Sequence, residues 1–158
     1  MIVKKAEMEP VECIVRAYLV GSGLAEYERS ASVCGIQLPE GLVNSSKLPE
    51  NIYTPSTKAE IGDHDENISY EQSIEILGEQ RAQALRDKRL EIFNRASEHA
   101  ETRGIIIADT KFEFGYVNGV LTLCDEVLTP DSSRFWNKSD YKSGQNQASF
   151  DKQFVRDW

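Results

Sequence analysis

Ile107-Ala108-Asp109-Thr110-Lys111-Phe112-Glu113-Phe114-Gly115 decides the fold, because this stretch is typical of a β-strand with two different faces. Side chains alternate along a strand, so Asp109, Lys111 and Glu113 share one face and the two phenylalanines share the other. The aromatic face suits a core. Two carboxylates with a lysine between them can hold a divalent cation and an anion together, as handling of a nucleoside triphosphate requires. The alternative is a half-exposed strand with ordinary surface charges.

A hairpin is predicted directly after this strand, because Asn118-Gly119 stands between two apolar runs. The returning strand brings Asp125 and Glu126 back beside the charged face. A two-residue loop pairs Glu113 with Cys124 and leaves Asp125 on the aromatic face. A metal site shared by Glu113 and Asp125 therefore requires a loop with an odd number of residues or a bulge before Asp125. Without either, Glu126 is the better candidate.

A second strand is predicted at residues 11 to 20, and it runs into Gly21-Ser22-Gly23 and a helix at about 24 to 32. A strand, a turn of small residues and a helix make a phosphate-binding geometry, because glycines let the backbone approach and a helix N-terminus favours an anion. Arg16 in the strand would add a planar charged fork. The alternative is a tight turn beside an arginine that is buried or paired on the surface.

A third motif runs from Leu128 to Trp136 and contains Pro130-Asp131-Ser132-Ser133, which is typical of a turn. Arg134 follows between hydroxyls and aromatic rings, so its guanidinium is expected to be held in place. That arrangement suits recognition of an oxyanion. The alternative is a loop arginine stacked on Trp136.

The middle of the chain is predicted to be rich in loops over residues 35 to 68, which contain three prolines. Ser69-Tyr70-Glu71-Gln72 has the pattern of a capping box that opens a helix. A long helix is predicted from about Gly78 to Arg103, with an apolar stripe that faces the core. Residues 137 to 148 are expected to be a polar segment, and residues 138 to 146 within it are expected to form a mobile linker.

Composition narrows the class of protein. The formal net charge is −8 and no dense basic stripe is present, which argues against nucleic acid as a partner. No apolar run approaches the length of a membrane span, and no signal peptide is visible. The three cysteines have no metal-binding spacing and are expected to be reduced thiols in the cytosol. One core and a single domain over residues 1–158 are expected.

Together these motifs resemble one family, the SAICAR synthetases, which are phosphoribosylaminoimidazole-succinocarboxamide synthases of de novo purine synthesis. The resemblance runs in order from about Val3 to Trp158. It rests on Glu12-Cys13-Ile14-Val15-Arg16 with Gly21-Ser22-Gly23, on Thr54–Glu60, on His64-Asp65-Glu66-Asn67, on Asp109–Gly115 and on Asp131–Trp136.

The resemblance implies an α+β fold in which an antiparallel β-sheet packs against helices. Family members begin with a β-rich lobe whose glycine-rich loop and lysines cover the nucleotide, and they continue into C-terminal helices. The chain is therefore expected to be the central and carboxy-proximal, substrate-binding part of such an enzyme. Its nucleotide cleft, of the ATP-grasp or kinase-like kind, is expected to be incomplete because the N-terminal nucleotide lobe is missing.

The function implied is that of a cytoplasmic ATP-dependent ligase. It would join L-aspartate to carboxyaminoimidazole ribonucleotide through an acyl phosphate and release SAICAR, ADP and phosphate. The alternative is a catalytically silent fragment or assembly module that keeps only the ribonucleotide pocket. The oligomeric state stays open, with a homo-oligomer as one option.

The resemblance also implies roles for single residues at the nucleotide end of the site. Glu113 and Asp125 would bind Mg²⁺, and Lys111 would contact the ATP phosphates. Met8 would lie under the adenine. Asp109 would contact the ribonucleotide and, with Lys111, form the catalytic pair.

Substrate contacts are implied at six further positions. Arg16, Ser22 and Arg134 would hold the phosphate of the ribonucleotide. The remaining three expected substrate-binding residues are Ser133, Arg156 and Lys58.

Overall fold

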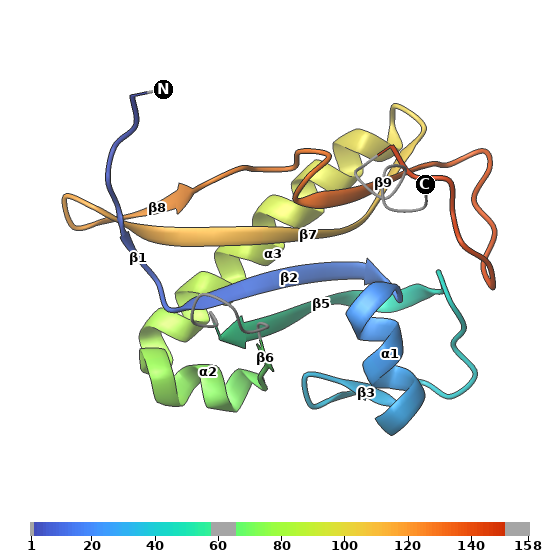
Figure 1. Cartoon of the computed structure of the whole chain (residues 1–158), viewed down its shortest axis with the longest axis horizontal. Helices are drawn as coiled ribbons and strands as arrows, with labels where there is room; N and C mark the ends of the chain where they lie inside the picture. Colours follow the sequence, from blue (N-terminus) through green and yellow to red (C-terminus); the bar gives the residue numbers. More distant parts are fainter. Residues whose placement is uncertain (1, 58–65, 151–158) are drawn as a thin grey trace.

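The computed structural model describes residues 2–57 and 66–150. Its centre is a seven-stranded antiparallel sheet with the path β1-β7-β2-β5-β6, and β8 and β9 pair with β7 off this path (Figure 1). Together with its helices the sheet confirms the expected α+β class. The strands are β1 (Glu7–Met8), β2 (Val11–Tyr18), β5 (Lys47–Thr57), β6 (Glu66–Asn67), β7 (Ile105–Val117), β8 (Val120–Cys124) and β9 (Ser133–Asn137).

Strand β7 organises the sheet because its 13 residues are long enough to pair with four other strands. The predicted alternation of its side chains is confirmed. Phe112 and Phe114 are buried in the main hydrophobic core, while Lys111 and Glu113 are only partly buried. The sheet therefore has one apolar face and one face that carries charge.

Two helices cover the apolar face. They are α2 (Tyr70–Leu77) and α3 (Glu79–Glu101), and Figure 1 shows α3 running diagonally behind β7 and β2. Ser69 and Gln72 form the predicted capping box at the start of α2. Gly78, with φ of +80°, separates the two helices, and Ala82, Leu85 and Phe93 of α3 are buried in the core.

A smaller layer covers one end of the charged face. It consists of α1 (Gly21–Ser30), β3 (Ser32–Val33) and β4 (Ile36–Gln37), with a second apolar cluster that includes Leu19, Tyr27 and Ile52. The predicted start of α1 was about three residues too late. Val20 is the extended N-cap, so Gly21-Ser22-Gly23 forms the first turn of the helix instead of a turn before it.

Two predictions about loops were wrong. Strand β5 lies inside the segment expected to be loop-rich, and Pro55 sits within it, opposite Cys13 of β2. The carbonyl of Pro55 accepts from the backbone N–H of Ile68, so the backbone N and O of this residue point away from β2 and the pairing needs no N–H there. The expected mobile linker at 138–146 is instead attached to the loop before β5, where Tyr141 Oη donates to the carbonyl of Ser45 at 2.8 Å.

The hairpin of β7 and β8 has the predicted two-residue Asn118-Gly119 loop, since Val117 pairs with Val120. Both loop residues have positive φ, +52° and +76°, as a type I′ turn requires. Within the described residues, no helix is long and apolar enough to cross a membrane.

Candidate active site

Three strands bring two arginines to one carboxylate on the charged face. Arg16 of β2 pairs with Asp109 of β7, and Asp109 pairs with Arg134 of β9. Nη1 of Arg16 lies 3.3 Å from Oδ2 of Asp109, and Nη1 of Arg134 bonds the same oxygen. Residues that are 93 and 25 positions apart in the sequence thus meet at one point.

The first turn of α1 closes over this cluster. Arg16 donates from Nη2 to Oγ of Ser22 at 3.0 Å and from Nε to Oγ1 of Thr54 at 3.1 Å. A Cβ at Gly23 would lie 3.2 Å from the Arg16 side chain, and a Cβ at Gly21 would lie 2.8 Å from Nη2 of Arg134. The small residues therefore let the helix N-terminus approach both guanidiniums.

The two arginines differ in how far they are exposed to solvent. Arg16 is 1% exposed, and its burial lowers the pKa of the guanidinium, an effect that Asp109 opposes and Arg134 reinforces. The side chain of Arg134 is 32% exposed. An anion that arrives from solvent would therefore meet Arg134, Ser22 and the N-terminal amides of α1, with Arg16 as the charge beneath them.

Lys111 is held between two carboxylates further along the same face. Its Nζ donates to Oε2 of Glu12 at 3.1 Å and lies 3.0 Å from Oε1 of Glu113. Partial burial alone would lower the pKa of Lys111, but the hydrogen bonds to Glu113 and Glu12 outweigh it and raise the pKa above its ordinary value. Lys111 is thus a fixed positive charge at neutral pH.

A cavity of about 810 Å³ opens in front of these groups. Glu12 and Lys111 line it from the sheet, Ser22 and Arg29 from α1, and Asn67 from β6. Because the cavity reaches both Lys111 and Ser22, it connects the lysine cluster with the end of α1 that lies over the arginines.

Met8 lies at the far end of β7 from the arginine cluster, where β1 pairs with β7. Met8 faces Gly115, and a Cβ at Gly115 would come within 2.7 Å of the Glu7 carbonyl. Glycine is required there for β1 to approach. Glu9 fixes the same segment, because its backbone N–H donates to Phe114 O at 2.9 Å and its buried carboxylate pairs with Arg81 of α3.

The hairpin has the register that, by strand alternation alone, separates the predicted metal pair. Glu113 pairs with Cys124, and neither an odd loop nor a bulge precedes Cys124. However, β8 ends at Cys124, and Asp125 is exposed with φ of +57°, so strand alternation does not govern its direction. Across residues 2–57 and 66–150, no group of three or more His, Cys, Asp or Glu side chains is arranged to hold a metal ion.

The other predicted substrate-binding residues lie elsewhere. Ser133 points to the helix-covered face, where its Oγ lies 2.6 Å from Oγ1 of Thr110, so it does not join the arginine cluster. Lys58 and Arg156 fall outside the described residues.

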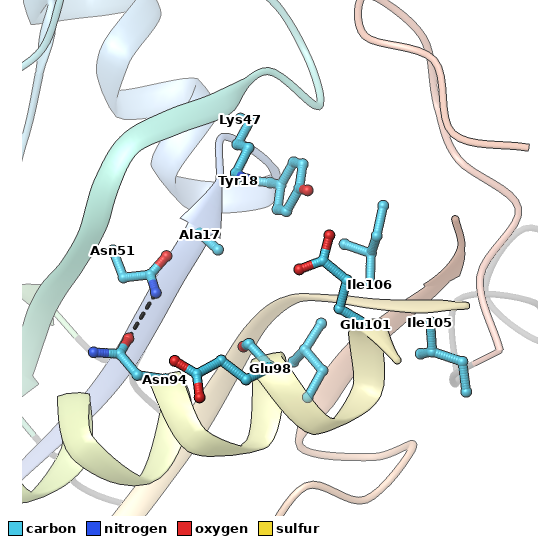
Figure 2. A pocket seen from close by; sticks show the side chains of 11 residues that line it. Ala17, Tyr18, Lys47, Asn51, Asn94, Glu98, Glu101, Ile105 and Ile106 are labelled. Atoms are coloured by element: carbon cyan, nitrogen blue, oxygen red, sulfur yellow. Dashed lines mark hydrogen bonds between the residues drawn. The ribbon is translucent and has the colours of Figure 1, made fainter. Parts of the chain in front are cut away.

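A second cavity, of about 390 Å³, lies between the C-terminal half of α3 and the sheet (Figure 2). Tyr18, Asn51, Asn94 and Glu101 are among the residues that line it, and Nδ2 of Asn51 donates to Oδ1 of Asn94 at 2.7 Å. It contains none of the predicted site residues.

Sequence reasoning missed Glu12 as a site residue, although a signal was present. Glu12 is four positions before Arg16 in a strand, so alternation places both side chains on the same face. A glutamate that is only 7% exposed requires a cationic partner, and Lys111 supplies it.

Comparisons of the sequence with a family model and with curated proteins point to the same family. The family model described as SAICAR synthetase matches residues 1–158. The phosphoribosylaminoimidazole-succinocarboxamide synthase of Corynebacterium diphtheriae is 60% identical over 159 residues, which cover 100% of this chain and 54% of the relative. The Geobacter sulfurreducens protein of the same name is 58% identical over 158 residues, and these make up 53% of its length.

Solved structures agree with the sequence relatives. SAICAR synthase from Saccharomyces cerevisiae, complexed with SAICAR, superimposes with a TM-score of 0.87 at 47% identity. The match covers 98% of this chain and 50% of the yeast chain. A SAICAR synthetase in complex with ADP has a TM-score of 0.74 at 28% identity, over 98% of this chain and 58% of its own. The chain spans about half the length of the curated relatives it matches, and it belongs to the SAICAR synthetase family.

Proposed function

We propose that this chain is the substrate-binding part of an ATP-dependent ligase that joins L-aspartate to carboxyaminoimidazole ribonucleotide. The observation that carries the proposal is the meeting of Arg16, Ser22 and Arg134 around Asp109 at the N-terminus of α1. Two guanidiniums, a hydroxyl and a helix N-terminus form a site for a phosphate monoester. The chain would accordingly be one domain of a cytoplasmic enzyme of purine biosynthesis.

The chemistry proposed has two steps. The γ-phosphoryl group of ATP passes to the carboxylate oxygen of the ribonucleotide and ADP leaves. The amine of L-aspartate then attacks the acyl carbon, the bond from that carbon to the phosphate oxygen breaks, and the amine loses a proton as the amide forms. Phosphorylation is needed because a free carboxylate has no adequate leaving group.

Lys111 is the residue best suited to the ATP phosphates. Its charge is fixed by Glu12 and Glu113, and it borders the cavity that also reaches Ser22. A preorganised ammonium stabilises the charge that develops on a transferring phosphoryl group. Met8, on the edge strand beside Gly115, is proposed to lie under the adenine.

The donor set fits Mg²⁺ that is bound largely through phosphates. Such sites use one or two carboxylates and keep several waters, so a cluster of three protein ligands is not required. Glu113 and the exposed Asp125, which directly follows the cross-strand partner of Glu113, are the proposed ligands. Glu126, which accepts a hydrogen bond from Thr129 Oγ1, is the alternative to Asp125 that the two-residue loop favours. When bound, the ion would screen the phosphate charges.

Calorimetric titration of the ribonucleotide tests the proposal. Arg134→Gln is expected to weaken binding by about 1.5–3 kcal/mol, which is roughly 10- to 150-fold, since hydrogen bonds to charged groups contribute this much. Arg95→Gln, an exposed arginine on α3, is the matched control and should leave the affinity unchanged. Equal affinities for wild type and Arg134→Gln would reject the phosphate site.

A coupled assay of ADP release separates the ligase from the alternative of a silent fragment. Turnover that requires ATP, L-aspartate and the ribonucleotide together supports a ligase that is complete in this chain. Ribonucleotide binding without ADP release supports a chain that keeps only the ribonucleotide pocket.

A further inference from the structure

A stripe of α1 extends the candidate site beyond the phosphate-binding end. Ser22, Glu26 and Arg29 are spaced four and three residues apart and all line the 810 Å³ cavity. This spacing places them along one side of the helix. Seven residues of α-helix rise about 10 Å, so Arg29 lies at the opposite end of the stripe from Ser22.

Arg29 has unused hydrogen-bond donors. Its Nε donates to the carbonyl of Ala25 at 3.1 Å, and within the described part of the chain Nη1 and Nη2 make no hydrogen bond or ion pair. The other cation that lines the cavity, Lys111, is engaged by Glu12 and Glu113. Among the described residues that line the cavity, Arg29 is therefore the cation that is available to a ligand.

Glu26 does not neutralise Arg29, because both of its carboxylate oxygens are used. Oε1 accepts from the backbone N–H of Cys34 at 2.7 Å, and Oε2 accepts from Nδ2 of Asn67 at 2.8 Å. A carboxylate only accepts hydrogen bonds, so this contact fixes the orientation of the Asn67 amide. Among the described residues nothing donates to Oδ1 of Asn67, so it stays an acceptor in a residue that lines the cavity.

These two groups define the chemistry of a ligand. A guanidinium with both terminal nitrogens unused pairs with a carboxylate in a bidentate manner, and a fixed amide oxygen accepts from an ammonium. A cavity of about 810 Å³ lies at the upper end of the range for small-ligand sites, so two small molecules fit. A small amino acid with a carboxylate satisfies both groups.

We infer that Arg29 and Asn67 form the subsite for the amino-acid substrate, with Arg29 binding a carboxylate and Asn67 Oδ1 accepting from the ammonium. The inference rests on the proposed function, which supplies L-aspartate as that substrate. It adds a specificity-determining pair about two helical turns from the ribonucleotide phosphate.

The test is binding of two probes to the chain in the presence of saturating ribonucleotide. L-Aspartate and succinate differ in the ammonium group, so they report separately on the two residues. Arg29→Gln is expected to weaken both probes at least tenfold. Asn67→Leu is expected to weaken L-aspartate severalfold and to leave succinate unchanged. Ribonucleotide affinity should stay constant in both variants, and Arg95→Gln is the control for a lost surface charge.

Several outcomes overturn the inference. Arg29→Gln with wild-type affinity for both probes removes Arg29 from the site, and Asn67→Leu with wild-type affinity for L-aspartate removes Asn67. A wild-type chain that binds the ribonucleotide but not L-aspartate rejects the subsite and leaves the ribonucleotide pocket intact. A chain that binds neither rejects the proposed function itself. Arg29 is exposed, so its variant should fold, and thermal unfolding checks this.

Discussion

Nζ of Lys111 lies 3.1 Å from Oε2 of Glu12, so the long strand β7 directs its lysine against a carboxylate of the neighbouring strand β2. Glu113 holds the same ammonium from the other side. Lys111 is therefore charged and oriented by the sheet itself. A group that must meet a phosphate gains from this, because less reorganisation is needed when the ligand binds.

Glu12→Gln should make Lys111 more reactive. Loss of one negative partner lowers the pKa of the ammonium toward its ordinary value, and each unit increases the neutral fraction about tenfold. Mass spectrometry after labelling with an amine reagent near pH 10 measures the change. Glu50→Gln, at an exposed position, is the control and should not alter labelling of Lys111. An unchanged labelling rate in Glu12→Gln would show that Glu113 alone sets the pKa.

Asp109→Asn should destabilise the fold strongly. The substitution leaves the guanidinium of Arg16, which is buried, and that of Arg134 without their shared carboxylate. Breaking a buried ion pair costs about 3–5 kcal/mol, and the amide oxygen should recover part of this. Urea unfolding gives the free energy, and Asp87→Asn, which breaks the exposed pair with Arg86, should change it by less than about 1 kcal/mol. Equal effects of the two variants would contradict the prediction.

Gly21→Ala and Gly41→Ala form a matched pair. Both glycines have positive φ, +56° and +83°, so either alanine should cost about 1–2 kcal/mol of stability. Only at Gly21 does the new Cβ meet another group, the far end of the Arg134 side chain at 2.8 Å. Similar losses of stability are therefore expected, with weaker ribonucleotide binding in Gly21→Ala alone. Calorimetry decides the issue, and equal ribonucleotide affinities would remove Arg134 from the phosphate site.

Gly115→Ala should displace β1 and the proposed adenine contact. The added Cβ would lie 2.7 Å from the Glu7 carbonyl and 3.1 Å from Cα of Met8, so the backbone of β1 must shift. Equilibrium binding of ATP should weaken while ribonucleotide affinity is unchanged. Gly119→Ala is the control, because it strains the hairpin loop and meets no atom within 4 Å. Retained ATP affinity in Gly115→Ala would exclude Met8 as the residue under the base.

The free energy of unfolding should fall at alkaline pH. Burial raises the pKa of Cys13 and of Cys34 to about 12, whereas the unfolded thiols ionise near pH 9. Because the pKa of each thiol is higher in the folded than in the unfolded protein, the neutral thiol contributes its full stabilisation of the fold below pH 9. This stabilisation is lost as pH rises from about 9 to 12. The loss at pH 10 is about 1.4 kcal/mol per thiol.

Urea unfolding from pH 8 to 11 measures this dependence. A Cys34→Ala variant should show a shallower fall than the wild type, because one of the two thiols no longer contributes. Identical slopes would show that Cys34 does not contribute to the pH dependence.

Local chemistry was predictable where neighbouring residues determine it. The Asn118-Gly119 loop follows from two adjacent residues that tolerate positive φ, and the capping box follows from Ser69 and Gln72. Alternation in β7 placed Asp109, Lys111 and Glu113 on one face. Alternation could not show that β8 stops at Cys124, so it does not determine the direction of the Asp125 side chain.

Long-range effects were not predictable. Strand β5 was missed because Pro49 and Pro55 break the local pattern, although pairing with β2 supports the strand. Arg89 of α3 is an arginine in a helix whose apolar stripe alone was assigned to the core. It is buried, where Nη2 donates to Val11 O at 3.0 Å and Nη1 to Tyr53 Oη at 3.1 Å. Partners so distant in sequence leave no periodic signal.

The carboxylate shared by Arg16 and Arg134 has an evolutionary consequence. Since Asp109 compensates the buried charge of Arg16, selection for folding alone would preserve these residues in a descendant that had lost its enzymatic activity. Lys111 is more exposed, and its loss would burden the fold less. Under the proposed function, drift at Lys111 among homologues while Arg16 and Asp109 stay fixed would mark the lineages that no longer carry out the reaction.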